Sequence, residues 1–431
     1  MSWSPWAKVR RSRDGSVDSP AETWTDSVER IGLKMQRPVY LDHHATTPVD
    51  PRVLEAMLPY FAEKFGNPAS RTHVFGAEAE DAVTAARREV AGLIGAEGRD
   101  VLFTSGATES DNLALQGAVA RTGPERNHIV TATTEHKAVL DTCRHLERSG
   151  RAQVTYLRVS ATGEIDPEDV RRALRPETAL VSLMLANNEI GTVHPIAEIG
   201  RITRAAGVWL HVDASQGVGL IPVDVAAMQI DLLSISGHKI YGPKGVGDLY
   251  VRGRAPRVRV EPEILGGGHE RGMRSGTLNV PGIVGLGCAC ALLRDGGADE
   301  AVRLRGLRDR LSGALLAGVE GAQLHGAPER RHPGNVNVGF PGVDGESLLM
   351  ALPEIAVSSG SACTSATLEP SYVLRAIGVG DRLAHGSLRF GIGRQTTAAE
   401  VDYAAARVIE EVGRLRRLRG GRRLASGEAG G

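Results

Sequence analysis

Short apolar runs alternate along the chain with segments in which apolar residues recur at helical spacing. The helical spacing predicts core-facing helices at 52–65, through Leu54, Met57, Leu58 and Phe61, and at 83–93, through Val83, Ala86, Val90 and Leu93. The apolar runs predict strands at 101–103, 129–130, 179–185, 208–212 and 230–235. This alternation is typical of βα units, so we expect an α/β fold with a largely parallel sheet.

Polar or small residues follow every one of these predicted strands. The five endings are Thr104–Thr108, Thr133–His136, Asn187–Asn188, Asp213–Gln216 and Ser236–Lys239. In open α/β sheets, ligands bind just beyond the carboxyl ends of the strands. We therefore expect the five endings to converge on a single crevice.

The pattern changes after about residue 297, where a long charged helix over 299–316 precedes Gly- and Pro-rich connections and shorter strands. We interpret 49–297 as a large domain, and 37–48 together with 298–417 as a smaller one. A chain of 431 residues is long enough for two domains. Residues 1–36 are interpreted as a disordered polar extension, and 418–431 as a disordered basic, Gly-rich tail.

Composition narrows the classes of function. Lys plus Arg and Asp plus Glu number 51 each, so no overall charge favours nucleic acid or an anionic membrane. No apolar run is long enough to span a bilayer. The four cysteines, Cys143, Cys288, Cys290 and Cys363, do not form a disulfide framework and fit a reducing compartment. We expect a cytoplasmic protein with no direct contact to nucleic acid or membrane.

The strand endings contain the groups that an aldehyde cofactor with a phosphate needs. Ser105–Thr108 opens a helix, whose N-terminal amides can hold a phosphate, although a plain helix cap is the alternative. Ser236 and His238 add a hydroxyl and an imidazole beside Lys239, whose amine can form a Schiff base. A surface lysine is the alternative for Lys239 taken alone.

Three further residues suit the ring of such a cofactor. Asp213 can keep a pyridine nitrogen protonated, Gln216 can hydrogen-bond a phenolic oxygen, and His136 can stack on the ring or relay a proton. A structural role in the core is the alternative for each of them. No metal site is predicted: His43 and His44 are adjacent on an extended segment and point to opposite faces, and Cys288-Ala-Cys290 lacks a second pair.

Cys363 lies in a run of small residues, 358–366, which suits a mobile loop that carries a reactive thiol. A chance cysteine in a flexible loop is the alternative. Arg389, within Ser387-Leu-Arg-Phe390, is a candidate for binding a substrate carboxylate, as are many other arginines.

Six motifs in order resemble those of the cysteine desulfurases of the IscS/NifS type, in the class V aminotransferase superfamily. They occupy 40–48 (YLDHHATTP), 65–70 (FGNPAS), 103–112 (FTSGATESDN), 236–245 (SGHKIYGPKG), 266–277 (GGGHERGMRSGT) and 358–363 (SSGSAC). The similarity extends from about Pro38 to about Leu415.

The resemblance implies a homodimeric enzyme of fold type I that uses pyridoxal 5'-phosphate (PLP). Its large domain would have a mostly parallel seven-stranded sheet between helices, and its C-terminal domain would be a smaller α+β unit. Lys239 would hold the cofactor as a Schiff base. Asp213, Gln216 and His136 would contact the ring, and the phosphate ligands would be Ala107, Thr108, Ser236, His238 and, from the other subunit, Thr277.

The implied reaction converts L-cysteine to L-alanine, with Asn188 and Arg389 binding the substrate carboxylate and Lys239 moving the Cα proton. Cys363 would take the sulfur as a persulfide, could transiently ligate a cluster on a scaffold partner, and would pass sulfur on for iron–sulfur assembly or for tRNA or cofactor thiolation. The tail by which housekeeping members bind the scaffold has no match here. Alternatives are a selenocysteine lyase, a class V aminotransferase and a PLP-fold protein that acts only as a scaffold.

Overall fold

The structure is a computed structural model that describes the backbone of residues 38–359 and 370–427, and side chains as far as residue 418. A seven-stranded sheet has the order β2-β8-β7-β6-β5-β3-β4. Its strands are β2 (Val101–Thr104), β3 (His128–Ala132), β4 (Gln153–Leu157), β5 (Thr178–Met184), β6 (Trp209–Asp213), β7 (Leu232–Ser236) and β8 (Gly247–Val251). Only β8 is antiparallel to its neighbours, so the other six strands end at one edge of the sheet.

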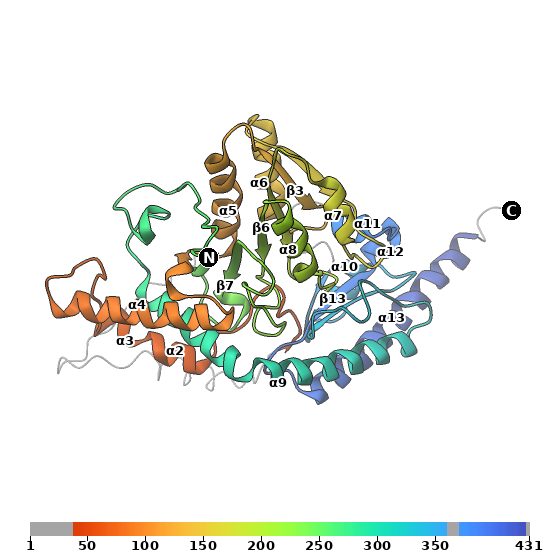
Figure 1. Cartoon of the computed structure of the whole chain (residues 1–431). Helices are drawn as coiled ribbons and strands as arrows, with labels where there is room; N and C mark the ends of the chain where they lie inside the picture. Colours follow the sequence, from red (N-terminus) through yellow and green to blue (C-terminus); the bar gives the residue numbers. More distant parts are fainter. Residues whose placement is uncertain (1–37, 360–369, 428–431) are drawn as a thin grey trace, which may run out of the picture. The chain divides into compact units, whose positions relative to one another are not determined.

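Successive side chains of each strand point to opposite faces of the sheet, and apolar side chains lie on both faces. Helices therefore cover both faces. Phe103 packs with one helical layer and Leu102 with the other. The first layer contains α4 (Val74–Leu93), α7 (Pro167–Ala173), α8 (Ile196–Ala205) and part of α9 (Val280–Gly318); the second contains α5 (Ala107–Thr122) and α6 (Lys137–Arg148). Figure 1 shows α5 and α8 against the strands of the sheet. The predicted α/β fold with a mostly parallel seven-stranded sheet is confirmed.

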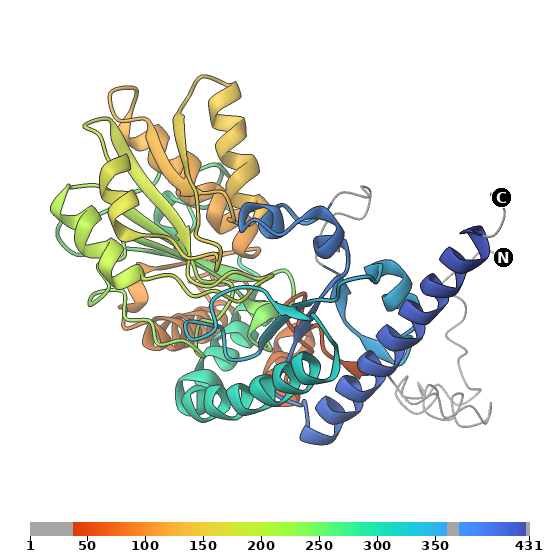
Figure 2. The ribbon, with the colours of Figure 1, turned by 90° about the vertical axis from the view of Figure 1, so that its right-hand side faces the viewer.

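A second apolar core lies around a four-stranded sheet of order β12-β13-β10-β9. Its strands are β9 (Gln323–Leu324), β10 (Asn335–Gly339), β12 (Ser358–Ser359) and β13 (Ser387–Gly391), and β1 (Val39–Tyr40) pairs separately with β11 (Ile355–Ala356). The nearby helices are α10 (Gly345–Met350), α11 (Tyr372–Ala376), α12 (Asp381–His385) and α13 (Ala398–Gly427). Helix α9 contributes Leu286 to the first core and Leu311 to the second, and Figure 2 shows it beside α13.

Several expectations about individual elements need revision. The segment 52–65 forms two short helices, α2 (Pro51–Met57) and α3 (Pro59–Ala62), which break at Pro59. The expectation that their apolar face meets the core is right for Met57, which is buried in the first core, and wrong for Leu54, Leu58 and Phe61, which are 48%, 57% and 62% exposed. The charged helix begins at Val280, nineteen residues before its expected start, and ends close to the expected residue. Strands β4 and β8 were not predicted.

The division into large and small domains stays a prediction, and α13 continues past residue 417, where the small domain is expected to end. Three short helical turns, η1 (Gly98–Asp100), η2 (Gly237–Lys239) and η3 (Glu270–Gly272), complete the described elements. Within the described residues, no helix is both long and apolar enough to cross a bilayer. Cys363 lies in 360–369, and the predicted extension over 1–36 lies within 1–37; both are outside the described residues.

Candidate functional site

A cavity of about 620 Å³ lies at the edge where the parallel strands end. The segments after five strands reach it: 105–108 after β2, His136 after β3, Asn188 after β5, 213–216 at the end of β6 and 236–239 at the end of β7. Arg389, on β13 of the other sheet, also lines it. The structure thus brings together ten predicted site residues: Ala107, Thr108, His136, Asn188, Asp213, Gln216, Ser236, His238, Lys239 and Arg389.

The turn before α5 gives this cavity an anion-binding end. Gly106 has a φ of +146°, which side-chain-bearing residues rarely adopt, and a Cβ on the neighbouring Gly247 would lie 2.7 Å from the Gly106 Cα. The two glycines let β8 approach the turn closely. Helix α5 begins at Ala107, and the first turn of an α-helix leaves backbone amides without intrahelical acceptors. These amides and the positive end of the helix dipole favour a bound phosphate.

Ser236, the last residue of β7, lies near the Gly106 turn, and His238, in η2, lines the same cavity. The His238 Nδ1 lies 3.1 Å from the Thr46 hydroxyl, which orients the ring. Burial, together with the charges of Lys239 and Lys244, lowers the pKa of His238 to about 4. His238 is therefore neutral at neutral pH and can act as a hydrogen-bond donor to a phosphate without adding a charge.

Lys239 is the last residue of η2 and points toward the chain segment that follows β1. Its Nζ donates hydrogen bonds to the carbonyl oxygens of His44 and, at 2.9 Å, of Ala45. Two carbonyl acceptors hold the amine, and Lys239 lines the same cavity as Asp213 and His136. The arrangement allows an amine to be presented to a carbonyl group bound in the cavity.

Asp213 ends β6 with its carboxylate at the cavity wall, where Oδ1 accepts a hydrogen bond from the Ser215 amide at 2.9 Å. Behind it, His211 is fully buried between the hydroxyls of Ser182 (2.8 Å) and Ser234 (3.0 Å). The neighbouring Asp111 is also buried, and burial, reinforced by the charge of Asp213, raises its pKa well above the usual value. Asp111 does not line the cavity, whereas Asp213 does.

His136 caps α6, since its Nδ1 accepts a hydrogen bond from the Ala138 amide at 3.2 Å. Because Nδ1 accepts, a neutral ring carries its proton on Nε2. Burial lowers the pKa of His136, and Asp213 partly opposes that effect. The ring therefore enters the cavity in its neutral form, which suits stacking on an aromatic group.

Arg389 and Asn188 line the same cavity and contact each other. Arg389 is 3% exposed; its Nη1 donates to the Asn188 carbonyl oxygen at 3.2 Å and its Nη2 donates to Ser358 Oγ, also at 3.2 Å. Its Nε and the Asn188 Oδ1 have no hydrogen-bond partner among the described residues. A buried guanidinium with an unpaired donor suits a carboxylate ligand.

Several cavity residues were not singled out from the sequence as site residues. His44 was considered only as a metal ligand and set aside, yet it lines the cavity and contacts Gln216. Lys244 and Glu109 also line it, and their membership in the motifs around Lys239 and Ala107 is the signal that could have found them. Thr277 is exposed and does not line this cavity, and Cys363 lies outside the described residues. No group of residues in the described ranges could hold a metal ion.

The residues present fit PLP. The α5 turn matches a phosphate, Asp213 matches a protonated pyridine nitrogen, and Lys239 matches an aldehyde. Ser215 Oγ, at the same wall, is buried without a hydrogen-bond partner in the described structure, as is the Asn188 Oδ1. Unpaired buried polar atoms are costly, so a polar ligand that pairs with these two atoms would remove that cost.

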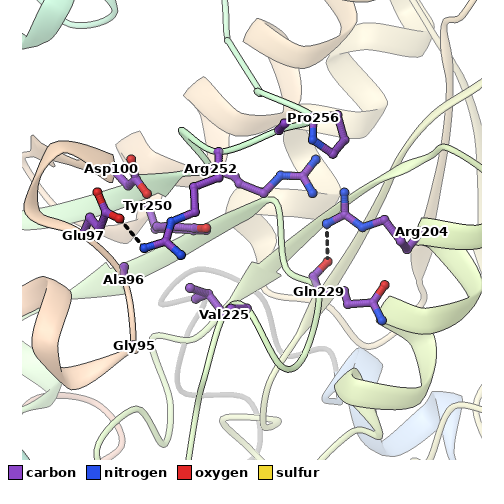
Figure 3. Close-up of a pocket in the computed structure, with 13 residues that line it drawn as sticks. Gly95, Ala96, Glu97, Asp100, Arg204, Val225, Gln229, Tyr250, Arg252 and Pro256 are labelled. Atoms are coloured by element: carbon purple, nitrogen blue, oxygen red, sulfur yellow. Dashed lines mark hydrogen bonds and ion pairs between the residues drawn. The ribbon is translucent and has the colours of Figure 1, made fainter.

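A second cavity, of about 320 Å³, lies at the opposite edge of the sheet, near Asp100, Tyr250 and Arg252. Figure 3 shows Arg204 directed toward Gln229 there. Arg204 and Arg252 share the Asp231 carboxylate at 3.2 and 2.6 Å. Its arginines are thus engaged in ion pairs, and none of the predicted site residues lines it.

The fold and the cavity together define an α/β enzyme with a cofactor-type site at the carboxyl ends of its strands. The family model "Aminotransferase class-V" matches residues 39–404. The chain therefore belongs to the class-V aminotransferase family.

Named relatives place it more narrowly. The chain is 60% identical over 384 residues to "Cysteine desulfurase IscS" of Anaeromyxobacter dehalogenans, which covers 89% of this chain and 95% of the relative. Among solved structures it is similar to "NIFS-LIKE PROTEIN", with a TM-score of 0.81, 37% identity and coverage of 87% of this chain and 99% of the other. It is also similar to "SspA in complex with cysteine", with a TM-score of 0.72, 37% identity and coverage of 82% and 98%.

Proposed function

We propose that the chain is a PLP-dependent cysteine desulfurase that converts L-cysteine to L-alanine and takes up the sulfur on Cys363. The observation that carries this proposal is the content of one cavity: a lysine, an anion-binding helix end and a buried arginine with an unpaired donor surround the same space. The relatives named cysteine desulfurase, at up to 60% identity, support the same reaction.

Different residues of the cavity bind the phosphate, the ring and the substrate carboxylate. Ala107, Thr108, Ser236 and His238 hold the phosphate, while Asp213, Gln216 and His136 hold the ring. Arg389 and Asn188 hold the substrate carboxylate. When bound, PLP supplies an electron sink that stabilises negative charge at the substrate Cα.

Lys239 has two roles. Its amine holds the cofactor before substrate arrives, and it then takes the Cα proton of cysteine and returns a proton to the product carbon. Two carbonyl acceptors, those of His44 and Ala45, orient the amine. A carbonyl can only accept, so these contacts hold the amine through its own hydrogens.

Cys363 takes the sulfur from the substrate. Its thiolate attacks the substrate sulfur; the new S–S bond forms as the carbon–sulfur bond breaks, and the carbon keeps the electron pair and is protonated to give alanine. Of the three cysteines in the described structure, none lines the cavity. Burial raises the pKa of Cys143 to about 12 and that of Cys290 well above its usual value, so neither provides a thiolate.

We also propose that the active form is a homodimer in which Thr277 of one subunit adds a phosphate ligand to the other. Apolar side chains are exposed on α3 and around the start of α4: Phe61 (62%), Phe65 (64%) and Phe75 (46%), with Phe65 and Phe75 stacked 5.5 Å apart between ring centroids. We call these three residues the phenylalanine patch. A soluble chain covers such a patch most simply with a second copy.

The sulfur acceptor is proposed to be a protein, either an iron–sulfur scaffold or a sulfur-relay protein. The compartment is proposed to be the cytoplasm. Neither direct nucleic-acid binding nor membrane binding is part of the proposal.

The deciding experiment gives the purified protein L-cysteine and a reductant and measures sulfide and alanine together. The parent should release both in equal amounts. Cys363→Ala should abolish sulfide release, whereas Cys288→Ala, a matched change of a half-exposed cysteine outside the cavity, should not. Sulfide release by Cys363→Ala at the parent rate would remove Cys363 from its role.

The same assay separates the alternatives. Amino transfer to a keto acid without sulfide would favour an aminotransferase. A much higher kcat/KM for selenocysteine than for cysteine would favour a selenocysteine lyase, and a PLP-loaded protein without turnover would favour a scaffold.

A further inference from the structure

Two hydrogen bonds fasten the side chain of Gln216 to His44, a residue 172 positions earlier in the chain. The Gln216 Nε2 donates to the His44 carbonyl oxygen at 3.0 Å, and the Gln216 Oε1 lies 2.9 Å from the His44 Nδ1. A backbone carbonyl only accepts, so the amide must turn its nitrogen toward it. The oxygen then faces Nδ1, which must carry a hydrogen. The contacts therefore fix both the amide orientation and the tautomer.

The environment of His44 keeps this arrangement in place. The ring is 4% exposed and packs edge-on against His332, with 4.7 Å between ring centroids. Burial, followed by the charges of neighbouring groups, lowers the pKa of His44 well below 6.5, so the ring is neutral at neutral pH. A neutral imidazole has one N–H, and Nδ1 uses it. The carbonyl oxygen of His44 also accepts from Lys239, so His44 contacts two of the proposed cofactor ligands.

We propose that His44 is a positioning residue that holds the Gln216 amide with its nitrogen, not its oxygen, as the group available to the phenolic oxygen of PLP. This inference rests on the proposed function, because it needs the cofactor in the cavity. The Gln216 nitrogen carries two hydrogens, and the His44 carbonyl takes one of them. The second is free to donate to a phenolic oxygen, whereas a flipped amide would oppose one oxygen to another.

The test compares three substitutions in the full chain. His44→Leu removes the Nδ1 donor, one of the two contacts that hold the amide, and leaves only the backbone carbonyl of residue 44 to orient it. His44→Asn places an amide N–H close to the position of Nδ1 and should rescue. His43→Leu is the matched control, because His43 is the adjacent buried histidine, its Nδ1 lies 2.9 Å from the Gly391 oxygen, and it does not line the main cavity.

Two readouts are independent of turnover. The first is the affinity of the apoprotein for added PLP, and the second is the pH at which the bound cofactor changes its visible absorbance. A donor to the phenolic oxygen favours the deprotonated form, so His44→Leu should raise that pH by about one unit and weaken PLP binding about tenfold. His44→Asn should bring the affinity to within about threefold of the parent. His43→Leu should leave both readouts unchanged.

The coupling to Gln216 gives a stricter criterion. In a Gln216→Leu background, His44→Leu should cause no further shift of the absorbance change, because the group that it positions is gone. Three outcomes would each overturn the proposal. The pH of the absorbance change could stay the same in His44→Leu, it could shift equally in His43→Leu, or it could shift fully again in the double variant. A parent that binds PLP but releases no sulfide would contradict the desulfurase activity alone. A parent that takes up no PLP would overturn both.

Discussion

Arg389 and Asp42 form an ion pair with an Nη2 to Oδ1 distance of 2.8 Å, and this pair leaves the Arg389 Nε without a partner within the described structure. The pair joins β13 to the segment after β1 and holds the guanidinium at the end of the cavity. Asp42 thus orients Arg389 while leaving part of its fork unused. A substrate carboxylate can take that remaining part.

Arg389→Lys should therefore raise KM for L-cysteine by about tenfold or more, because a lysine keeps the charge but loses the fork. Steady-state sulfide release at varied cysteine concentrations measures this. Affinity for PLP, measured on the apoprotein, should stay within about threefold of the parent, since Arg389 is assigned to the substrate carboxylate and not to the cofactor. An unchanged KM would contradict the assignment of Arg389 to the carboxylate.

Lys239→Ala should lose both turnover and covalent capture of the cofactor. Borohydride reduction of the PLP-loaded parent, followed by mass spectrometry, should locate the cofactor on Lys239. Lys244→Ala is the matched control, because Lys244 lines the same cavity and belongs to the same motif. It should retain capture at Lys239. Capture on Lys244 in the parent would move the cofactor-binding role to that residue.

Much of the site was predictable because it depends on local patterns. Each apolar run followed by polar residues indicates a strand and its ending, and parallel strands end at one edge, so residues such as Asp213 and Lys239 were expected together. His44 was not predicted as a site residue because its role depends on its contact with Gln216. The two residues are far apart in the sequence, so no local pattern indicates this contact. Strand β8 was not predicted because it is short and contains the buried Asp248, which interrupts its apolar run.

The prediction that the apolar side chains of α2 and α3 face the core failed at Leu54, Leu58 and Phe61 for a different reason. Helical spacing indicates that a helix has an apolar face, but it does not indicate whether the same chain covers that face. Pro59 divides the segment, and Leu58 and Phe61 then face outward. The misprediction itself therefore points to a surface that another copy could cover.

If a second copy covers the phenylalanine patch, charges placed there should separate the subunits. Phe65→Glu combined with Phe75→Glu buries two unpaired carboxylates in such an interface, so the molecular mass from light scattering should halve. Met350→Glu is a control on α10, at a side chain that is 77% exposed and outside the patch. It should leave the mass unchanged. A double variant with the mass of the parent would place the dimer interface elsewhere.

The buried histidines should make the fold sensitive to acid. His194 is buried, neither ring nitrogen has a partner among the described residues, and burial lowers its pKa to about 4. An unfolded histidine has a pKa of about 6.5, so between those values the unfolded chain binds more protons than the folded chain. The stabilisation is present above about pH 6.5 and is lost as the pH falls toward 4.

Unfolding of the apoprotein by urea at several pH values measures this slope. The free energy of unfolding of the parent should decrease as the pH falls from about 6 to about 4.5. In His194→Leu this decrease should be smaller by up to about 1.4 kcal/mol per pH unit. His145→Leu, at an exposed histidine, should leave the slope as in the parent. The reduction is partial, because burial also lowers the pKa of His325 to about 4 and of His332 to about 3, and these rings add slopes of the same sign. Equal slopes in the parent and in His194→Leu would show that His194 takes up no proton on unfolding.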